Sequence, residues 1–322
     1  GGGPAVGGSG VGGSGGGARV GDGGSGVGGS GVGGSGGGAR VGDGGSGVGG
    51  SGGGARVGDG GSGVGGSGAG ARVGDGGAVR GGGRAHGRTV VLWPDTFTNY
   101  LSPSVGQAAV RVLEDAGLRV VVPPKPVCCG LTWVSTGQLD RARAVMRRTL
   151  DVMAPALDAG LPVVGLEPSC TAALRTDLPE LLGPADPRAA RLADAVTTFA
   201  GALEDLAPDW QPPTVDRPVV GQTHCHQHAV LGDAAERRLR ARAGLTGELS
   251  GGCCGLAGNF GFERGHYDVS VACAEEQLLP SVRSADPAAE VLADGFSCRT
   301  QLDQLAGRRA RHLAEVLAER LP

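Results

Sequence analysis

The residues most suited to chemistry in this sequence are two adjacent cysteines enclosed by glycines, Gly251-Gly252-Cys253-Cys254-Gly255. Glycine lets the backbone adopt turns that other residues resist, and the two cysteine side chains leave the backbone in different directions. Such a loop is poorly suited to a core or to a disulfide between its own two thiols. It is well suited to wrapping a metal cluster and offering it two thiolates at once.

Two further cysteines extend this pair to a set of four. Cys225 lies 28 residues before Cys253, and Cys298 lies 44 residues after Cys254. Four cysteines meet the ligand count of a [4Fe–4S] cluster and that of a four-thiolate zinc site. Zinc sites commonly use Cys-x-x-Cys pairs, which this sequence lacks, so the spacing favours an iron–sulfur cluster. Zinc, a disulfide and unligated thiols are the alternatives.

An earlier copy of the motif, Cys128-Cys129-Gly130, is followed by Cys170 but has no cysteine at the position that matches Cys225. Its three thiols, together with the carboxylate of Glu167, form a second candidate metal site. We interpret it as a degenerate copy of the first. A site used for packing or substrate contact is the alternative.

His224 and His226 flank Cys225 in the sequence. We expect them to lie just outside the ligands, where hydrogen-bond donors tune the potential of a cluster. The alternative is that they are surface or helix-capping histidines. The eighth cysteine, Cys273, lies within a helical pattern and is expected to be a small buried apolar residue.

The cysteine motifs follow segments typical of buried strands and precede segments with helical periodicity. Strands are expected at 88–93, 118–122, 162–166, 218–222 and 290–293, and helices at 102–117, 136–158, 188–206, 233–242, 267–284 (with a break near Pro280) and 300–320. Alternating strands and helices favour parallel sheets covered by helices, with ligand loops at the carboxyl ends of strands. We therefore expect an α/β protein of two duplicated modules, with Cys225 and Cys298 close to Cys253 and Cys254.

The first 87 of the 322 residues are mostly glycine and contain nothing large to bury. The unit Ala-Arg-Val-Gly-Asp-Gly-Gly recurs there from positions 18, 39, 55 and 71. Such composition is typical of a flexible tether. We expect a disordered Gly/Ser-rich linker over residues 1–87, a first cysteine-rich module over 88–176, a connector over 177–216 and a second module over 217–322.

The charge balance argues against a nucleic-acid partner, because the net charge is −3 and no basic stripe is present. No apolar run reaches the about 18 residues needed to span a bilayer, so no integral membrane segment is expected. The expected location is the cytoplasm, with peripheral attachment at the inner face of the membrane as the alternative.

Several motifs in combination resemble a known family, the cysteine-rich domains found in iron–sulfur subunits of heterodisulfide reductase, glycolate oxidase and anaerobic glycerol-3-phosphate dehydrogenase. The chain is most similar to the C-terminal part of FAD-linked oxidases fused to an iron–sulfur region. The resemblance covers about residues 89–321. Its motifs are Asp-Thr-Phe-Thr-Asn-Tyr (95–100), Glu-Pro-Ser-Cys (167–170), His-Cys-His-Gln (224–227), Gly-Gly-Cys-Cys-Gly (251–255) and Asp-Gly-Phe-Ser-Cys-Arg-Thr-Gln (294–301).

The chain departs from the family pattern of a lone cysteine, Cys-Cys-Gly and Cys-x-x-Cys in each module. Thr96 stands where the lone cysteine of the first module belongs. Glu167 and Gly295 stand where the first cysteine of Cys-x-x-Cys belongs in the two modules. We therefore do not expect the five-cysteine noncubane cluster of this family, whereas the second module keeps four cysteines for an ordinary [4Fe–4S] cluster.

The resemblance implies an iron–sulfur electron-transfer module of a flavin-linked oxidoreductase that oxidises a 2-hydroxy acid such as lactate or glycolate. The electron donor would be FAD on a flavin-containing dehydrogenase domain or subunit, and the acceptor would be a quinone or another carrier. The chain would not act on the substrate alone. A zinc-stabilised non-redox binding domain and an inactive relic of a larger oxidoreductase are the alternatives.

Overall fold

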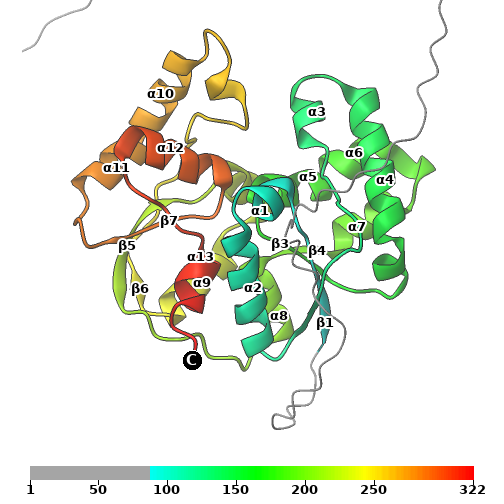
Figure 1. Cartoon of the computed structure of the whole chain (residues 1–322), viewed down its shortest axis with the longest axis horizontal. Helices are drawn as coiled ribbons and strands as arrows, with labels where there is room; N and C mark the ends of the chain where they lie inside the picture. Colours follow the sequence, from blue (N-terminus) through cyan, green and yellow to red (C-terminus); the bar gives the residue numbers. More distant parts are fainter. Residues whose placement is uncertain (1–87) are drawn as a thin grey trace, which may run out of the picture. The chain divides into compact units, whose positions relative to one another are not determined.

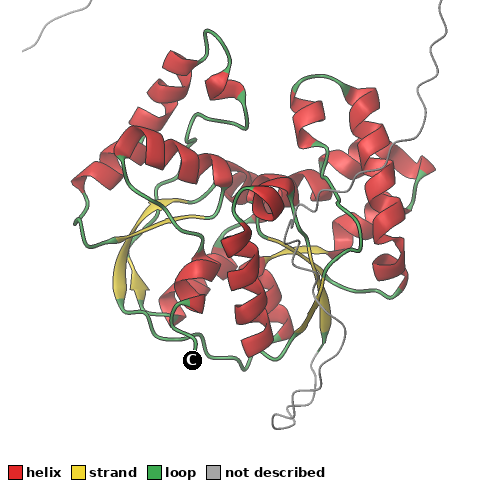
Figure 2. Ribbon diagram, viewed as in Figure 1, coloured by secondary structure: helices red, strands yellow, loops and turns green. Residues whose placement is uncertain are grey.

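The computed structural model describes residues 88–322, which form a mixed α/β structure with two parallel sheets (Figures 1 and 2). The expected α/β class with parallel sheets is thereby confirmed. The prediction of a disordered linker falls on residues 1–87, outside the described residues. No helix among residues 88–322 has both the length and the apolar character needed to span a bilayer.

The first sheet has four parallel strands in the order β2-β1-β3-β4. Its central strands, β1 and β3, are buried runs of branched apolar residues, as expected for a parallel sheet covered on both faces. The bounds are β1 (Thr89–Leu92), β2 (Arg119–Val121), β3 (Val163–Gly165) and β4 (Val196–Thr198).

The second sheet repeats this arrangement with three parallel strands in the order β6-β5-β7. An isolated parallel bridge between Leu292 in β7 and Arg311 occupies the position that β4 has in the first sheet. The bounds are β5 (Arg217–Gln222), β6 (Leu245–Thr246) and β7 (Glu290–Ala293). We refer to residues 88–206, which carry the first sheet, as the first half and to residues 217–322 as the second half.

The helices follow the strands in a similar order in the two halves. In the first half they are α1 (Thr96–Tyr100), α2 (Pro103–Asp115), α3 (Leu131–Ser135), α4 (Leu139–Asp158), α5 (Pro168–Arg175), α6 (Asp177–Leu182), α7 (Arg188–Ala195) and α8 (Phe199–Leu206). In the second half they are α9 (Ala234–Arg242), α10 (Tyr267–Glu276), α11 (Leu278–Ser284), α12 (Phe296–Ala306) and α13 (Leu313–Ala318), with a π-helical turn η2 (Gln227–Leu231) and a short 3₁₀ turn η3 (Phe260–Phe262).

The two halves share one apolar core, which fixes them against each other. Helices α2 and α8 of the first half and α9 and α13 of the second lie between the two sheets (Figure 1). One cluster of buried side chains includes Val112, Leu203, Leu239 and Leu317 from these four helices. The outer face of each sheet has its own core, against α4 to α7 in the first half and against α10 to α12 in the second.

Two local features differ from the expectations drawn from the sequence, and a third agrees with them. Strand β4 lies in the segment expected as a connector, and it pairs with β3 as the fourth strand of the first sheet. The last helical segment is two helices, α12 and α13, because residues 307–312 lie between them and include the bridge at Arg311. The break expected near Pro280 is confirmed and falls at Gln277, since the ring of Pro280 would clash with a helical carbonyl four residues earlier.

Candidate metal centre

The two Cys-Cys-Gly turns have the same local geometry. The backbone N–H of Gly130 donates to Cys128 Sγ at 3.4 Å, and that of Gly255 donates to Cys253 Sγ at 3.3 Å. Both glycines have a left-handed φ, 83° and 84°, which a residue with a Cβ adopts only at a cost. The glycine after each cysteine pair is therefore what turns the backbone so that its N–H points at the first sulfur.

The structure brings together all four cysteines predicted to bind metal in the second half. Cys225 follows β5, Cys298 lies in the first turn of α12 after β7, and Cys253 and Cys254 lie in the loop that follows β6. Each thiol contacts the next in the order Cys225, Cys253, Cys254 and Cys298. Cys254 and Cys298 are buried, whereas Cys225 and Cys253 are half-buried.

One of these four sulfurs is stabilised as a thiolate. Contacts with the Cys225 and Cys254 thiols lower the pKa of Cys253. The contact with Cys253, followed by burial, raises the pKa of Cys225. Contacts with Cys253 and then Cys298 raise the pKa of Cys254. The site therefore concentrates negative charge on a sulfur, which suits a cation or a cationic iron core.

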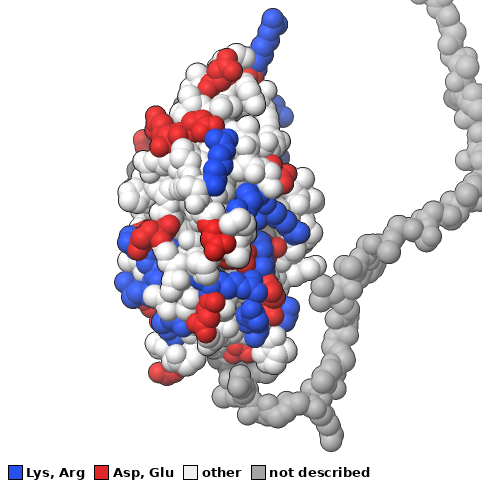
Figure 3. Space-filling model, turned by 90° about the vertical axis from the view of Figure 1, so that its left-hand side faces the viewer, with Lys and Arg blue, Asp and Glu red and all other residues white. Residues whose placement is uncertain are grey.

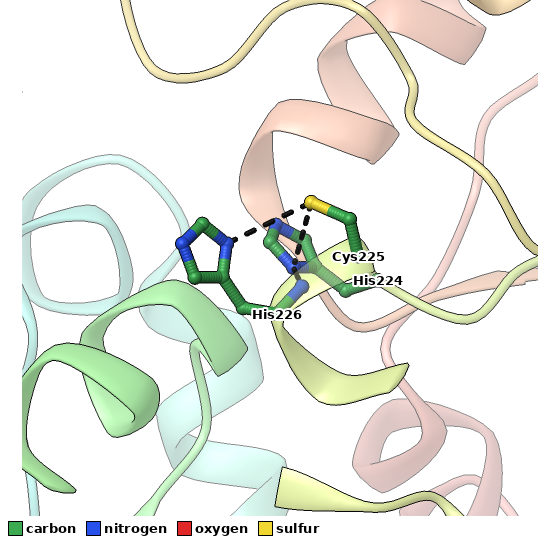
Figure 4. A group of neighbouring side chains, drawn as sticks. All are labelled: His224, Cys225 and His226. Atoms are coloured by element: carbon green, nitrogen blue, oxygen red, sulfur yellow. Dashed lines mark hydrogen bonds between the residues drawn. The ribbon is translucent and has the colours of Figure 1, made fainter. Parts of the chain in front are cut away.

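The two histidine rings flank the sulfur of Cys225, as Figure 4 shows. The Nδ1 atoms of His224 and His226 lie 3.9 and 3.7 Å from Cys225 Sγ. His224 Nδ1 accepts the backbone N–H of His226 at 3.1 Å, so the proton of the neutral ring is on Nε2. Burial, together with the neighbouring His226, lowers the pKa of His224 to about 4. Both rings therefore lie beside Cys225 Sγ. Their expected role in tuning the potential of a cluster stays a prediction.

Glu167 joins the two halves at this site. Its carboxylate is 3% exposed; Oε1 accepts from Ser169 Oγ at 2.8 Å and Oε2 accepts from the backbone N–H of Phe296 at 2.7 Å. His224 Nε2 lies 3.9 Å from Oε1. Glu167 thus caps α12 of the other half. A role for Glu167 as a metal ligand of the first half stays a prediction.

Gly295, which is equivalent to Glu167, has a steric reason to lack a side chain. A Cβ at this position would overlap the ring of His224. The histidine ring therefore occupies the space where the family pattern has another cysteine side chain. This packing explains the departure at Gly295 by tertiary contact, which the sequence alone did not show.

The three thiols of the first half also meet, in a different electrostatic state. Cys129 Sγ and Cys170 Sγ are 3.2 Å apart, and the hydroxyl of Thr96 contacts Cys128. Contact with Cys129, followed by burial, raises the pKa of Cys128. The contact with Cys128 lowers the pKa of Cys129, whereas the contact with Cys170 and burial raise it. The net effect is a raised pKa.

Both cysteine groups border one cavity of about 340 Å³ between the halves. The first half contributes Thr96, Cys128, Cys129, Ser169 and Cys170, and the second half contributes His224, Cys225, His226, Cys253 and Cys254. The volume is in the range of small-molecule and cofactor sites. Four cysteines from three loops, one of them a stabilised thiolate, are a donor set that fits a [4Fe–4S] cluster.

The sequence reasoning missed several residues that hold the site in place. The rings of Phe97 and Phe296 stack across the two halves at 4.8 Å. The buried ring of His312 caps α13 and contacts the carbonyl of Leu166 at 3.1 Å through Nε2. His312 and Glu315 form a capping box, but the sequence signature of this motif begins with Ser, Thr, Asp or Asn, so the histidine gave no such signal. The aromatic pair gave no local signal because its partners are far apart in the chain.

The surface charge is mixed over the face of residues 88–322 drawn in Figure 3, with Lys and Arg side chains interspersed with Asp and Glu. Second-half arginines form ion pairs such as Arg237 with Glu248 and Arg311 with Glu319. Neither sign forms a continuous surface on that face.

Comparison with known proteins places this geometry in a family. A family model described as "CCG: Cysteine-rich domain" matches residues 95–175, which include the first Cys-Cys-Gly motif. The chain is 30% identical over 256 residues to lactate utilization protein A of Exiguobacterium sp. (strain ATCC BAA-1283 / AT1b), covering 71% of this chain and 97% of that protein. The chain therefore belongs to the cysteine-rich (CCG) domain family that includes lactate utilization protein A.

Two relatives are larger than the matched region. One is a subunit of the anaerobic glycerol-3-phosphate dehydrogenase of Escherichia coli (strain K12), 27% identical over 237 residues, which are 72% of this chain and 59% of the relative. D-2-hydroxyglutarate dehydrogenase of the same strain is 30% identical over 241 residues, 72% of this chain and 22% of the relative. The chain thus spans about three fifths of the first of these relatives and about one fifth of the second.

Proposed function

We propose that the second half binds a [4Fe–4S] cluster through Cys225, Cys253, Cys254 and Cys298, and that the chain is the electron-transfer module of an FAD-linked oxidoreductase. The observation that carries this proposal is the convergence of four cysteines from three separate loops: Cys225, Cys253 and Cys254 line one cavity, and Cys298 contacts Cys254. Four-thiolate ligation is the usual mode of binding such a cluster.

A bound cluster of this kind would supply one-electron transfer at a potential set by its surroundings. The chain sets those surroundings. The N–H of Gly255 stabilises negative charge on Cys253 Sγ, and the histidine rings next to Cys225 Sγ place further polar groups at the ligands. Buried Cys254 and Cys298 hold the inner side of the site, and half-buried Cys225 and Cys253 face the shared cavity.

The substrate and the partners are inferred from the relatives. Two of the matched relatives are named as dehydrogenases of glycerol-3-phosphate and D-2-hydroxyglutarate, and a third as a lactate utilization protein. D-2-hydroxyglutarate and lactate are 2-hydroxy acids, so two of the three names support a 2-hydroxy acid of the lactate or glycolate type as the substrate class. We place FAD on a partner dehydrogenase domain or subunit, and a quinone or another carrier as the acceptor at the cytoplasmic face of the membrane.

One observation favours a second candidate, a zinc-stabilised binding domain without redox chemistry. The ligand atoms of His224, Cys225 and His226 lie within 4.8 Å of one another, and imidazole and thiolate are zinc ligands. The iron–sulfur proposal uses all four cysteines, whereas the zinc alternative uses only one of them together with two histidines.

Metal analysis after anaerobic purification distinguishes the two candidates. We expect iron and acid-labile sulfide with visible absorption, and we expect Cys254→Ser to lose most of the iron. Cys273→Ser is the matched control, because Cys273 is half-buried in α10 outside the cavity lining. Zinc in place of iron, with the metal lost on replacing His226 and retained in Cys254→Ser, would reject the electron-transfer proposal.

A further inference from the structure

The first half contains a thiol pair that the proposed function does not use. Cys129 Sγ and Cys170 Sγ are 3.2 Å apart, and both residues are 5% exposed. Cys129 lies in the turn before α3, whereas Cys170 lies in the first turn of α5. The third thiol, Cys128, is half-buried beside them, and its Sγ accepts the N–H of Gly130.

The oxygen-bearing side chains around these thiols already have interaction partners. The Thr96 hydroxyl contacts Cys128. Both carboxylate oxygens of Asp95 accept hydrogen bonds from Thr98, at 2.9 Å from its N–H and 2.6 Å from its hydroxyl. Both carboxylate oxygens of Glu167 are likewise taken, by Ser169 and by the N–H of Phe296. A metal held by the three thiols would take its fourth ligand from water or from a side chain that already has a hydrogen-bond partner.

We propose that Cys129 and Cys170 form a dithiol–disulfide couple, so that the first half is a thiol-redox site. Its co-reactant is a low-molecular-weight disulfide, RS–SR. One cysteine sulfur attacks RS–SR to form a mixed disulfide and release RSH. The second cysteine displaces the remaining RSH and forms the Sγ–Sγ bond, so two S–H bonds are broken in the protein and two are formed in the products.

The two sulfurs lie close to bonding distance. A disulfide has an S–S distance of about 2.05 Å, so sulfurs that are 3.2 Å apart must approach by about 1.1 Å. Both cysteines border the shared cavity of about 340 Å³, so a small disulfide can reach them although they are buried. Three of the four ligands proposed for the cluster, Cys225, Cys253 and Cys254, border the same cavity, and the couple would therefore lie next to that site.

The experiment uses the full chain, equilibrated without oxygen in mixtures of reduced and oxidised dithiothreitol. Free thiols are then alkylated, and the peptides are analysed by mass spectrometry without reduction. We expect a peptide linked through Cys129 and Cys170 whose fraction rises from near zero to near completion as the buffer becomes more oxidising. Cys170→Ser should abolish it, whereas Cys128→Ser should retain it. The linked peptide in the unmodified chain tests the proposal even if a variant fails to fold.

Iron and zinc are measured in the same samples. A pair that stays alkylatable at every buffer ratio, or a linkage between Cys128 and Cys129, would overturn the proposal. So would loss of metal in Cys170→Ser, because it would make the first half a metal site. Failure of the proposed function gives a different result, an iron-free protein in which the Cys129–Cys170 peptide still forms.

Discussion

Replacing Glu167 by Gln tests whether a buried carboxylate joins the two halves. Gln has the same shape, so its oxygen can still accept from the N–H of Phe296 and its amide group can still donate to Ser169. What it loses is the negative charge at the N-terminus of α12. A hydrogen bond to a charged group contributes about 1 kcal/mol more than a neutral one, and charge at a partly buried helix terminus contributes up to about 2 kcal/mol. We therefore expect a loss of about 2 kcal/mol.

For a chain of this size, each kcal/mol shifts the unfolding midpoint by about 2–4 °C. Glu167→Gln should therefore lower the midpoint by about 4–8 °C, measured by circular dichroism without oxygen. Glu167→Ala should lower it further, because the N–H of Phe296 is left without its carboxylate acceptor. Glu204→Gln, at an exposed ion pair with Arg238, is the control and should leave the midpoint nearly unchanged. Equal midpoints for Glu167→Gln and Glu204→Gln would refute the reasoning.

Two other predictions concern the turn and the pH dependence. Gly255→Ala should lower the free energy of unfolding by about 3 kcal/mol or more, since its Cβ would meet the backbone of Ser270. Gly258→Ala is the control, because its Cβ would enter open space, and it should cost about 1 kcal/mol. Equal urea midpoints for the two variants would contradict this prediction. Burial raises the pKa of the Glu236 carboxyl group, so the native state binds the proton of this group more tightly than the unfolded chain does. Stability therefore falls as the pH rises above the pKa of Glu in the unfolded chain, about 4.3. Glu236→Gln should flatten that fall in unfolding curves across pH, and an unchanged slope would show that Glu236 is not responsible.

Much of the architecture could be predicted from the sequence because it rests on local patterns. The buried strand runs, the Ser-Pro start of α2 and the helical spacing of α4 are set by residues close together in the chain. Strand β4 escaped prediction because only three residues form it, and its pairing with β3 is what stabilises it. The division of α12 from α13 escaped for the same reason, since Arg311 pairs with a strand about twenty residues away.

The sequence by itself determined the inventory of the site: two Cys-Cys-Gly turns, Cys225 and Cys298 after strands, and a first copy with fewer cysteines. These follow from residue type and from the conformations that glycine permits. Only the tertiary structure decided that both copies face one cavity, that Glu167 caps a helix of the other half, and that His224 fills the space beside Gly295. The physical reason is that these contacts join segments more than fifty residues apart, and it is the shared core between the two sheets that brings those segments together.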